Sequence, residues 1–344
     1  MATDEFKAIE EHSEDKKVVG RAHKVDHILK AGDLSVEIVS TLCQKALEMK
    51  TLVAQRGGDN RLEHRVLASI FYEPSTRTSC SFNAAMLRLG GKVMSLNQET
   101  SSVKKGESLE DTIQTMACYC DAIVLRHPQK GSAQLAAQYS SKPVINAGDG
   151  SGEHPTQALL DVFTIFSELG RVGNFSPILS HTSPSVLQRA EMRVTMLGDL
   201  KNGRTVHSLT HLLSLFTGIH IEYVSPIESL NMPQEIVEEL NVKGIPQTQG
   251  RTLDEAIVDA DVLYVTRIQK ERFESEEEYM EVCGSYCVDS AIMKKAKTNM
   301  IVMHPLPRLK EIATEVDADP RAKYFRQMEN GMYMRMAILD SMIP

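Results

Sequence analysis

Short apolar runs of strand length alternate along this chain with stretches that carry helical periodicity. The first apolar run is VLASIFY at residues 66–72, and later ones are expected at 91–97, 122–127, 143–148, 193–198, 219–225, 262–267 and 300–304. Helices are expected at 35–56, 76–89, 108–119, 156–169, 205–216, 233–243, 276–297 (interrupted) and 323–342. Strands that alternate with helices form parallel sheets covered by those helices, so the pattern predicts the α/β class.

One Ser/Pro-rich stretch, residues 173–191, interrupts the alternation, and its composition predicts a loop between two domains. A chain of 344 residues has room for about two domains of ordinary size. Because the alternation resumes after the loop, we expect two parallel-sheet α/β domains. Residues 1–20 are polar and aperiodic, which is typical of a disordered arm or a linker.

The chain is acidic overall, since 38 Lys and Arg stand against 46 Asp and Glu for a net charge of −8. This balance argues against nucleic acid as the main partner and against a polybasic membrane binder. No apolar run is long enough to span a membrane, and the N-terminal segment has the features of neither a secretory signal nor a transit peptide. The six cysteines include no C-x-x-C pair. We therefore expect reduced thiols and a cytoplasmic protein.

The residues that follow the expected strands are informative, because ligands of open α/β sheets bind beyond the carboxyl ends of the strands. Six of these strand ends carry an arginine or a histidine, and five of the six carry an arginine. The residues concerned are Arg77, Arg126, His154, Arg204, Arg267 and Arg308. In a chain with an acidic balance, such a gathering of cations predicts a site for small anions.

The segment Ser75–Thr78 (STRT) stands where an expected strand is followed by a helix. Backbone N–H groups and the dipole at a helix N-terminus favour a phosphate, and hydroxyl and guanidinium groups add further donors. Alternatively, Ser75 or Thr76 only caps the helix and Arg77 is solvated. The dipole disfavours a cation in the first turn, so Arg77 is better explained by a bound anion.

A similar junction occurs at HPTQ, residues 154–157. Pro155 fits the first helical position, which places His154 at the N-cap, facing the expected ligand. Gln157 either faces the ligand as well or completes a capping box, and the spacing leaves both readings open. Lys105 lies in a polar loop and would by its surroundings be a solvated surface residue.

Sequence motifs for several common kinds of chemistry are absent. The chain has no P-loop, no G-x-G-x-x-G, no H-E-x-x-H and no G-x-S-x-G. We therefore expect no nucleotide cofactor, no metal and no serine nucleophile.

Seven stretches between residues 71 and 308 form an ordered set: FYEPSTRTSCSF, SSVKKGESLEDT, LRHP, GDGSGEHPTQALLD, GDLKNGRTVHSL, VTRIQKERF and HPLPR. This set closely resembles the aspartate transcarbamoylases, the carbamoyltransferases of pyrimidine synthesis. RIQKERF and the C-terminal YFRQMENGMYMRMA are most similar to the transcarbamoylase domain of eukaryotic multifunctional pyrimidine-synthesis proteins.

The resemblance implies transfer of a carbamoyl group from carbamoyl phosphate to L-aspartate, without a cofactor. It implies a carbamoyl-phosphate domain at residues 1–168, an aspartate domain at 169–330, and a C-terminal helix at 331–344 that packs back on the first domain. It further implies a homotrimer whose active sites are shared between subunits, and it is compatible with a place in a larger multifunctional polypeptide.

The resemblance also assigns roles to individual residues. Those implied in binding carbamoyl phosphate are Ser75, Thr76, Arg77, Thr78, Ser101, Arg126, His154, Gln157, Leu306 and Pro307. Those implied in binding aspartate are Lys105, Arg204, Arg267 and Gln269, and those implied in catalysis are Arg77, Thr78, Lys105, Arg126 and His154. Ser101 and Lys105 would enter the active site from a neighbouring subunit. For Lys105, this replaces the prediction of a solvated surface residue.

Glu73 lies beside the expected phosphate loop, where a carboxylate would repel the substrate. We therefore predict that Glu73 pairs across the domains with Arg204 or Arg272 when the site closes.

Two other functions stay open at this point. Ornithine carbamoyltransferases share S-T-R-T and H-P-T-Q, but they typically carry H-C-L-P where this chain has His304-Pro305-Leu306-Pro307. A catalytically silent homologue that acts as a scaffold is the second alternative, and the complete set of anion-binding residues argues against it.

Overall fold

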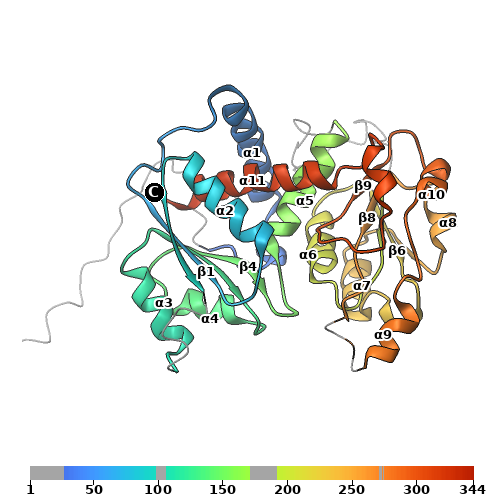
Figure 1. Ribbon diagram of the computed structural model, residues 1–344, viewed down its shortest axis with the longest axis horizontal. Helices are drawn as coiled ribbons and strands as arrows, with labels where there is room; N and C mark the ends of the chain where they lie inside the picture. The colour runs from blue at the N-terminus through green and yellow to red at the C-terminus, as the bar shows by residue number, and fades with distance from the viewer. Residues whose placement is uncertain (1–26, 98–105, 171–191, 271–272, 274) are drawn as a thin grey trace, which may run out of the picture.

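The computed structural model describes residues 27–97, 106–170, 192–270, 273 and 275–344. Two parallel sheets lie side by side, each with its own helices (Figure 1). All eight expected strands are present, with ends that differ from the prediction by at most two residues. The predicted α/β class with two parallel sheets is confirmed. Within the described residues, no helix is long and apolar enough to cross a membrane.

The first sheet has the strand order β2-β1-β3-β4, and all its pairs are parallel. Its strands are β1 (Val66–Phe71), β2 (Lys92–Asn97), β3 (Ala122–His127) and β4 (Val144–Asp149). The accompanying helices are α1 (Val36–Arg56), α2 (Thr76–Arg88), α3 (Leu109–Ala117), α4 (Ser132–Tyr139) and α5 (Pro155–Glu168). Every residue of β4 is buried, as expected for a strand covered on both faces.

The second sheet has the order β7-β6-β5-β8-β9 and is also parallel. Its strands are β5 (Met192–Leu197), β6 (Ile219–Val224), β7 (Gln247–Gln249), β8 (Val262–Val265) and β9 (Ile301–Met303). Its helices are α6 (Arg204–Leu213), α7 (Gln234–Val242), α8 (Leu253–Ala256), α9 (Glu276–Val282) and α10 (Ser290–Lys295). The stretch expected to be helical at 276–297 is therefore divided into α9 and α10.

Two elements of the second domain were not predicted. The strand β7 is a three-residue edge strand of sequence QTQ, which carries no apolar alternation. The helix α8 has only four residues and is held by a capping box between Thr252 and Glu255. Both are too short or too polar to produce a periodic signal. The predicted loop at 173–191 and the predicted arm at 1–20 lie outside the described residues.

The last helix, α11 (Tyr324–Met342), joins the two domains. It begins beside the second sheet and runs to the first domain, next to α1 and α2 (Figure 1). Its bounds agree with the helix predicted at 323–342. The apolar residues of α11 share one cluster with those of α1, α2 and α5. The helix α5 is buried at every position from Pro155 to Phe166, because α6 and α11 also cover it.

Both sheets have a point where the direction of strand addition reverses. In the first sheet it lies between β1 and β3, and in the second between β5 and β8. Open α/β proteins bind ligands beyond the carboxyl ends of the strands at such points. Arg126 lies at this end of β3, Arg267 follows β8, and Arg77 and Arg204 lie at the start of the helices α2 and α6, which come after β1 and β5.

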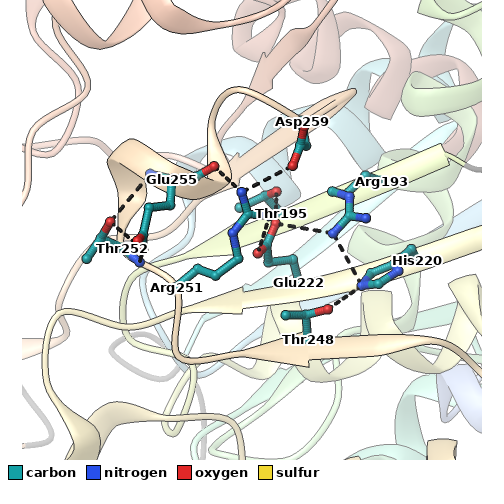
Figure 2. A network of polar contacts seen from close by, with 9 residues as sticks. All are labelled: Arg193, Thr195, His220, Glu222, Thr248, Arg251, Thr252, Glu255 and Asp259. Carbon is teal, nitrogen blue, oxygen red and sulfur yellow. Dashed lines mark hydrogen bonds and ion pairs between the residues drawn. The ribbon is translucent and has the colours of Figure 1, made fainter.

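A second cluster of charge lies within the second domain (Figure 2). We call it the Glu222 network, after its buried central carboxylate on β6. Glu222 lies 3.1 Å from a guanidinium nitrogen of Arg251 and 3.9 Å from one of Arg193. Arg251 also pairs with Asp259 at 3.1 Å. Figure 2 draws the residues of the Glu222 network, which are Arg193, Thr195, His220, Glu222, Thr248, Arg251, Thr252, Glu255 and Asp259.

Candidate active site

A cavity of about 1020 Å³ lies between the two domains and α11, and we call it the interdomain pocket. It is lined by the loops after β1, β5, β8 and β9, by Arg126 at the end of β3, and by residues of α2, α5, α6 and α11. The predicted site residues that it brings together are Glu73, Ser75, Thr76, Arg77, Thr78, Arg126, His154, Gln157, Arg204, Arg267, Gln269, Leu306 and Pro307. The predicted residues Ser101, Lys105 and Arg272 lie outside the described residues.

The N-terminus of α2 forms one wall of the pocket. Ser75 is its N-cap residue, but its side chain makes no capping hydrogen bond. The first turn contains no acidic residue, and Thr78 within it is buried. Burial and the nearby charge of Arg267 lower the pKa of Arg77. The geometry therefore favours anion binding by this segment over simple capping, because a half-buried cation in the first turn is stabilised by an anion.

A second group of charges joins the domains. Glu73 Oε2 lies 3.2 Å from Arg126 Nε and 3.8 Å from Arg204 Nη1, so Glu73 is within ion-pair distance of one of its predicted partners. Arg204 also donates a hydrogen bond to the backbone oxygen of Gly150 in the first domain. Burial and the charge of Arg204 lower the pKa of Arg126 to about 10. One carboxylate thus bridges two guanidinium groups that come from different domains.

The close approach of these two guanidinium groups depends on Gly148. A Cβ atom on Gly148 would lie 3.2 Å from both Arg126 Nη1 and Arg204 Cζ. Its φ of 117° also belongs to the region that favours glycine. The chain therefore has no side chain at the position where the two arginines meet.

His154 occupies the N-cap position of α5 and is 4% exposed. Its backbone N–H donates to Ser208 Oγ on α6 at 3.1 Å, and Ser208 donates to Glu153 at 2.6 Å. Burial and the charges of Arg204, Arg126 and Arg335 hold the pKa of His154 well below its usual value. The imidazole is therefore neutral at physiological pH.

Gln157 does not complete a capping box. Its side-chain amide instead donates to the buried Asp161 at 2.9 Å. The loop after β9 lies on the opposite wall, where Leu306 has a φ of 55° and its N–H donates to His304 Nδ1 at 2.7 Å. His304 Nε2 is in turn 2.9 Å from Glu311. Both walls are thus held by polar contacts behind the pocket.

The second domain contributes Arg267 and Gln269 from the segment after β8. The backbone N–H of Gln269 donates to Asp199 Oδ2 at 3.4 Å, and Asp199 also accepts from the side chain of Asn202 at 3.1 Å. Asp199, which is fully buried, therefore connects the loop before α6 to the segment after β8.

Sequence reasoning missed two buried residues at this site. Asp199 lies two residues after the end of β5, a strand next to the point where the direction of strand addition reverses. Its position could have identified it from the sequence. Arg335 lines the pocket from α11 and stacks on Phe82 at 5.0 Å, and burial lowers its pKa to about 10. A lone arginine between Met334 and Met336 on a buried helix is the signal that identifies it.

The lining as a whole carries an excess of positive charge, with five arginines against two glutamates. It offers guanidinium, hydroxyl, amide and neutral imidazole donors but no nucleophile with a matched base. Among the described residues, no cluster of His, Cys, Asp or Glu could hold a metal ion. Such a site can hold two small anions, one from each domain, and can donate hydrogen bonds to charge that develops between them.

Comparison with known proteins gives a consistent result. Residues 26–167 match the model of the aspartate/ornithine carbamoyltransferase carbamoyl-P binding domain, and residues 190–342 match that of the Asp/Orn binding domain. The chain is 47% identical over 91% of its length to the aspartate carbamoyltransferase catalytic subunit of Methanopyrus kandleri, covering 96% of that protein. It is 52% identical over 91% of its length to the multifunctional protein pyr1-3 of Dictyostelium discoideum, of which it spans only 13%.

A solved structure of aspartate transcarbamoylase from Trypanosoma cruzi in complex with carbamoyl phosphate is also similar. It superposes with a TM-score of 0.83 at 42% identity, over 93% of this chain and 97% of that one.

Proposed function

Because the chain belongs to the aspartate/ornithine carbamoyltransferase family, we propose that it is an aspartate carbamoyltransferase. It converts carbamoyl phosphate and L-aspartate to N-carbamoyl-L-aspartate and phosphate, an early step of de novo pyrimidine biosynthesis. The observation that carries this proposal is the excess of arginines that both domains turn into one pocket.

In the proposed assignment, each domain holds one anion. The N-terminus of α2 binds the phosphate of carbamoyl phosphate through Ser75, Thr76, Arg77 and Thr78. Arg204 and Arg267 bind the two carboxylates of aspartate, with Gln269 beside them. Arginine suits this task because its planar fork matches a carboxylate or a phosphate.

The reaction needs positioning and charge stabilisation rather than a protein nucleophile. The aspartate amine attacks the carbamoyl carbon, and negative charge grows on the carbamoyl oxygen. Thr78, Arg126 and His154 are the proposed donors to that oxygen. His154 donates from a neutral ring, since its pKa is well below its usual value. One preorganised donor of this kind contributes about 10²–10³-fold in rate.

Aspartate is favoured over ornithine on three grounds. Arg267 and Gln269 line the pocket and suit a second carboxylate rather than an ammonium group. Pro305 stands in the loop after β9 where ornithine enzymes typically have cysteine. The similar catalytic subunit from Methanopyrus kandleri is an aspartate enzyme by name.

The remaining assignments are the oligomer, the context and the location. We propose a homotrimer in which Ser101 and Lys105 complete the site of a neighbouring subunit. Mixing inactive Lys105→Ala and Arg77→Ala chains should then restore activity, because some sites would receive both intact residues. No recovery after verified subunit exchange contradicts shared sites. Similarity to pyr1-3 supports a place within a larger multifunctional polypeptide, and we propose that the protein is cytoplasmic.

One assay tests the proposed function. Purified protein is mixed with carbamoyl phosphate and either aspartate or ornithine, and the ureido product is measured. We expect product with aspartate only. Product with ornithine would instead identify the alternative enzyme, and no product with either amine would favour the silent scaffold.

The Glu73 bridge gives a second test. Glu73→Gln should raise the KM for aspartate, because it weakens the contacts that hold Arg126 and Arg204 together across the domains. Saturation curves identical to those of the wild type contradict a role in domain closure.

A further inference from the structure

A buried carboxylate outside the pocket connects three of the elements that surround it. Asp161 lies on α5 and is 0% exposed, and it does not line the interdomain pocket. Its Oδ1 accepts hydrogen bonds from Gln157 Nε2 at 2.9 Å and from Gln327 Nε2 at 2.7 Å. Its Oδ2 accepts one from the hydroxyl of Tyr264 at 2.7 Å. The three donors belong to α5, α11 and β8.

The ionised carboxylate of Asp161 fixes the orientation of the side-chain amides of Gln157 and Gln327. Because it can only accept hydrogen bonds, Gln157 and Gln327 must each turn their NH₂ group toward it. The oxygen of Gln327 then points away from Asp161 and accepts the backbone N–H of His304 at 2.9 Å. The oxygen of Gln157 is left on the side of its amide away from Asp161, where Gln157 lines the pocket.

These two orientations bear on the same substrate group. The NH₂ of carbamoyl phosphate is a donor and needs oxygen acceptors. Gln157, Leu306 and Pro307 all line the pocket, and we assign the Gln157 oxygen and the backbone oxygens of Leu306 and Pro307 as these acceptors. Gln327 holds His304, at the start of the loop that carries these two residues.

We propose that Asp161 is a positioning residue for carbamoyl recognition, which acts by orienting the Gln157 amide and, through Gln327, the loop after β9. This inference rests on the proposed function and deepens it. It also links the domains, since Tyr264 belongs to the strand that leads to Arg267.

The role requires the ionised form of Asp161, so it holds only above the pKa of this carboxyl. Burial raises its pKa to about 7, while hydrogen bonds from Tyr264, Gln327 and Gln157 and the charge of Arg335 act in the opposite direction. The carboxylate therefore depends on its three donors to remain an acceptor. Loss of any one of them favours the protonated form, which would present an O–H donor to the amides.

The test separates the carbamoyl group from the phosphate. Asp161→Asn keeps the shape of the side chain but replaces one acceptor oxygen with an NH₂ donor, which cannot satisfy all three donors. We expect the KM for carbamoyl phosphate to rise by about 10–100-fold. The inhibition constant of inorganic phosphate should stay within about twofold, because phosphate needs only the α2 terminus and its arginines.

A matched control variant can be made at another buried hydrogen bond between α5 and α11. Asn330 donates to Thr164 Oγ1 at 3.2 Å, and this buried bond joins α5 to α11 as the Asp161 contacts do. Thr164→Val removes it without touching Gln157 or His304. We expect a loss of stability but unchanged constants for carbamoyl phosphate and phosphate.

A second variant keeps the test decisive if Asp161→Asn does not fold. Tyr264→Phe removes one donor at a residue that does not itself line the pocket. It should raise the KM for carbamoyl phosphate about threefold to tenfold with the phosphate constant unchanged.

Two outcomes overturn the inference: unchanged constants in these variants, or equal weakening of carbamoyl phosphate and phosphate, which indicates a merely structural role. If the wild type itself forms no ureido product, the proposed function fails instead.

Discussion

The interdomain pocket and the Glu222 network both gather arginines, but they balance them differently. In the network, Arg193 and Arg251 face the buried Glu222, and Arg251 also pairs with Asp259 (Figure 2). The pocket lining has five arginines for two glutamates, and burial together with the neighbouring arginines lowers the pKa values of Arg77, Arg126 and His154. A balanced cluster supports the fold by itself, whereas an unbalanced one requires a bound anion. The comparison therefore separates residues that serve stability from residues that serve binding.

The largest effect is expected for an arginine of the pocket. Arg77→Ala should lower kcat/KM by about 10³-fold, which corresponds to about 4 kcal/mol, because it removes a charged donor from the phosphate site. The free energy of unfolding should not fall, since the substitution also removes repulsion with Arg267. Steady-state kinetics and urea denaturation measure the two quantities. A matching loss of stability would erase the distinction between the two regions.

The reverse result is expected in the Glu222 network. Arg251→Met removes the closer cation from the fully buried Glu222, which keeps Arg193 at 3.9 Å and the Thr195 hydroxyl at 3.4 Å. We expect the free energy of unfolding to fall by about 3 kcal/mol, because a buried charge loses its closer partner. The kinetic constants should stay within about twofold.

A double variant controls for this interpretation. Arg251→Met combined with Glu222→Met removes both members of the pair and should recover most of the lost stability. Failure to recover it would mean that packing, rather than the unpaired charge, causes the loss.

Phosphate binding should stabilise the variant of the Glu222 network but not the variant of the interdomain pocket. Inorganic phosphate at about 100 times its dissociation constant should raise the free energy of unfolding by about 2.7 kcal/mol in the wild type. Arg251→Met should gain the same amount, and Arg77→Ala should gain little, as measured by thermal unfolding with and without phosphate. An equal gain in both variants contradicts the placement of the phosphate site at α2.

The smallest effect concerns proton binding by His154, which burial and the neighbouring arginines disfavour. His154 has a folded-state pKa well below the usual 6.5, so the unfolded chain binds this proton more readily than the folded chain. The stability it contributes is complete above about pH 6.5 and is lost as the pH falls, by up to about 1.4 kcal/mol per pH unit.

Comparing His154→Asn with the wild type isolates this contribution. His127, His207 and His304 also have lowered pKa values, but they are present in both proteins. The free energy of unfolding of the wild type, minus that of His154→Asn, should decrease as the pH is lowered from 7.5 to 5.5. A constant difference would mean that His154 takes up no proton on unfolding in this range.

Local pattern was enough to predict the eight strands and several arginines of the pocket, and the family resemblance added residues such as Gln269 and Leu306. Strand runs such as 66–72 are apolar, and Arg77 and Arg126 lie after or at the end of such runs. The polar edge strand β7 is not an apolar run, so its position depends on pairing with β6.

Asp161 shows where prediction from the sequence fails. It was visible as the last residue of GEHPTQALLD, and its spacing from Gln157 suits a contact along one helix. Its other two donors lie 103 and 166 residues away in the chain, and only the folded structure brings them together.

The path of α11 has a consequence for how the protein is made. Its apolar residues complete the same core as α1, α2 and α5, although α11 is the last helix described in the chain. While the ribosome is still translating the second domain, the first therefore lacks part of its interior and exposes apolar surface. Closure of the amino-terminal half must wait until residues 324–342 have left the exit tunnel.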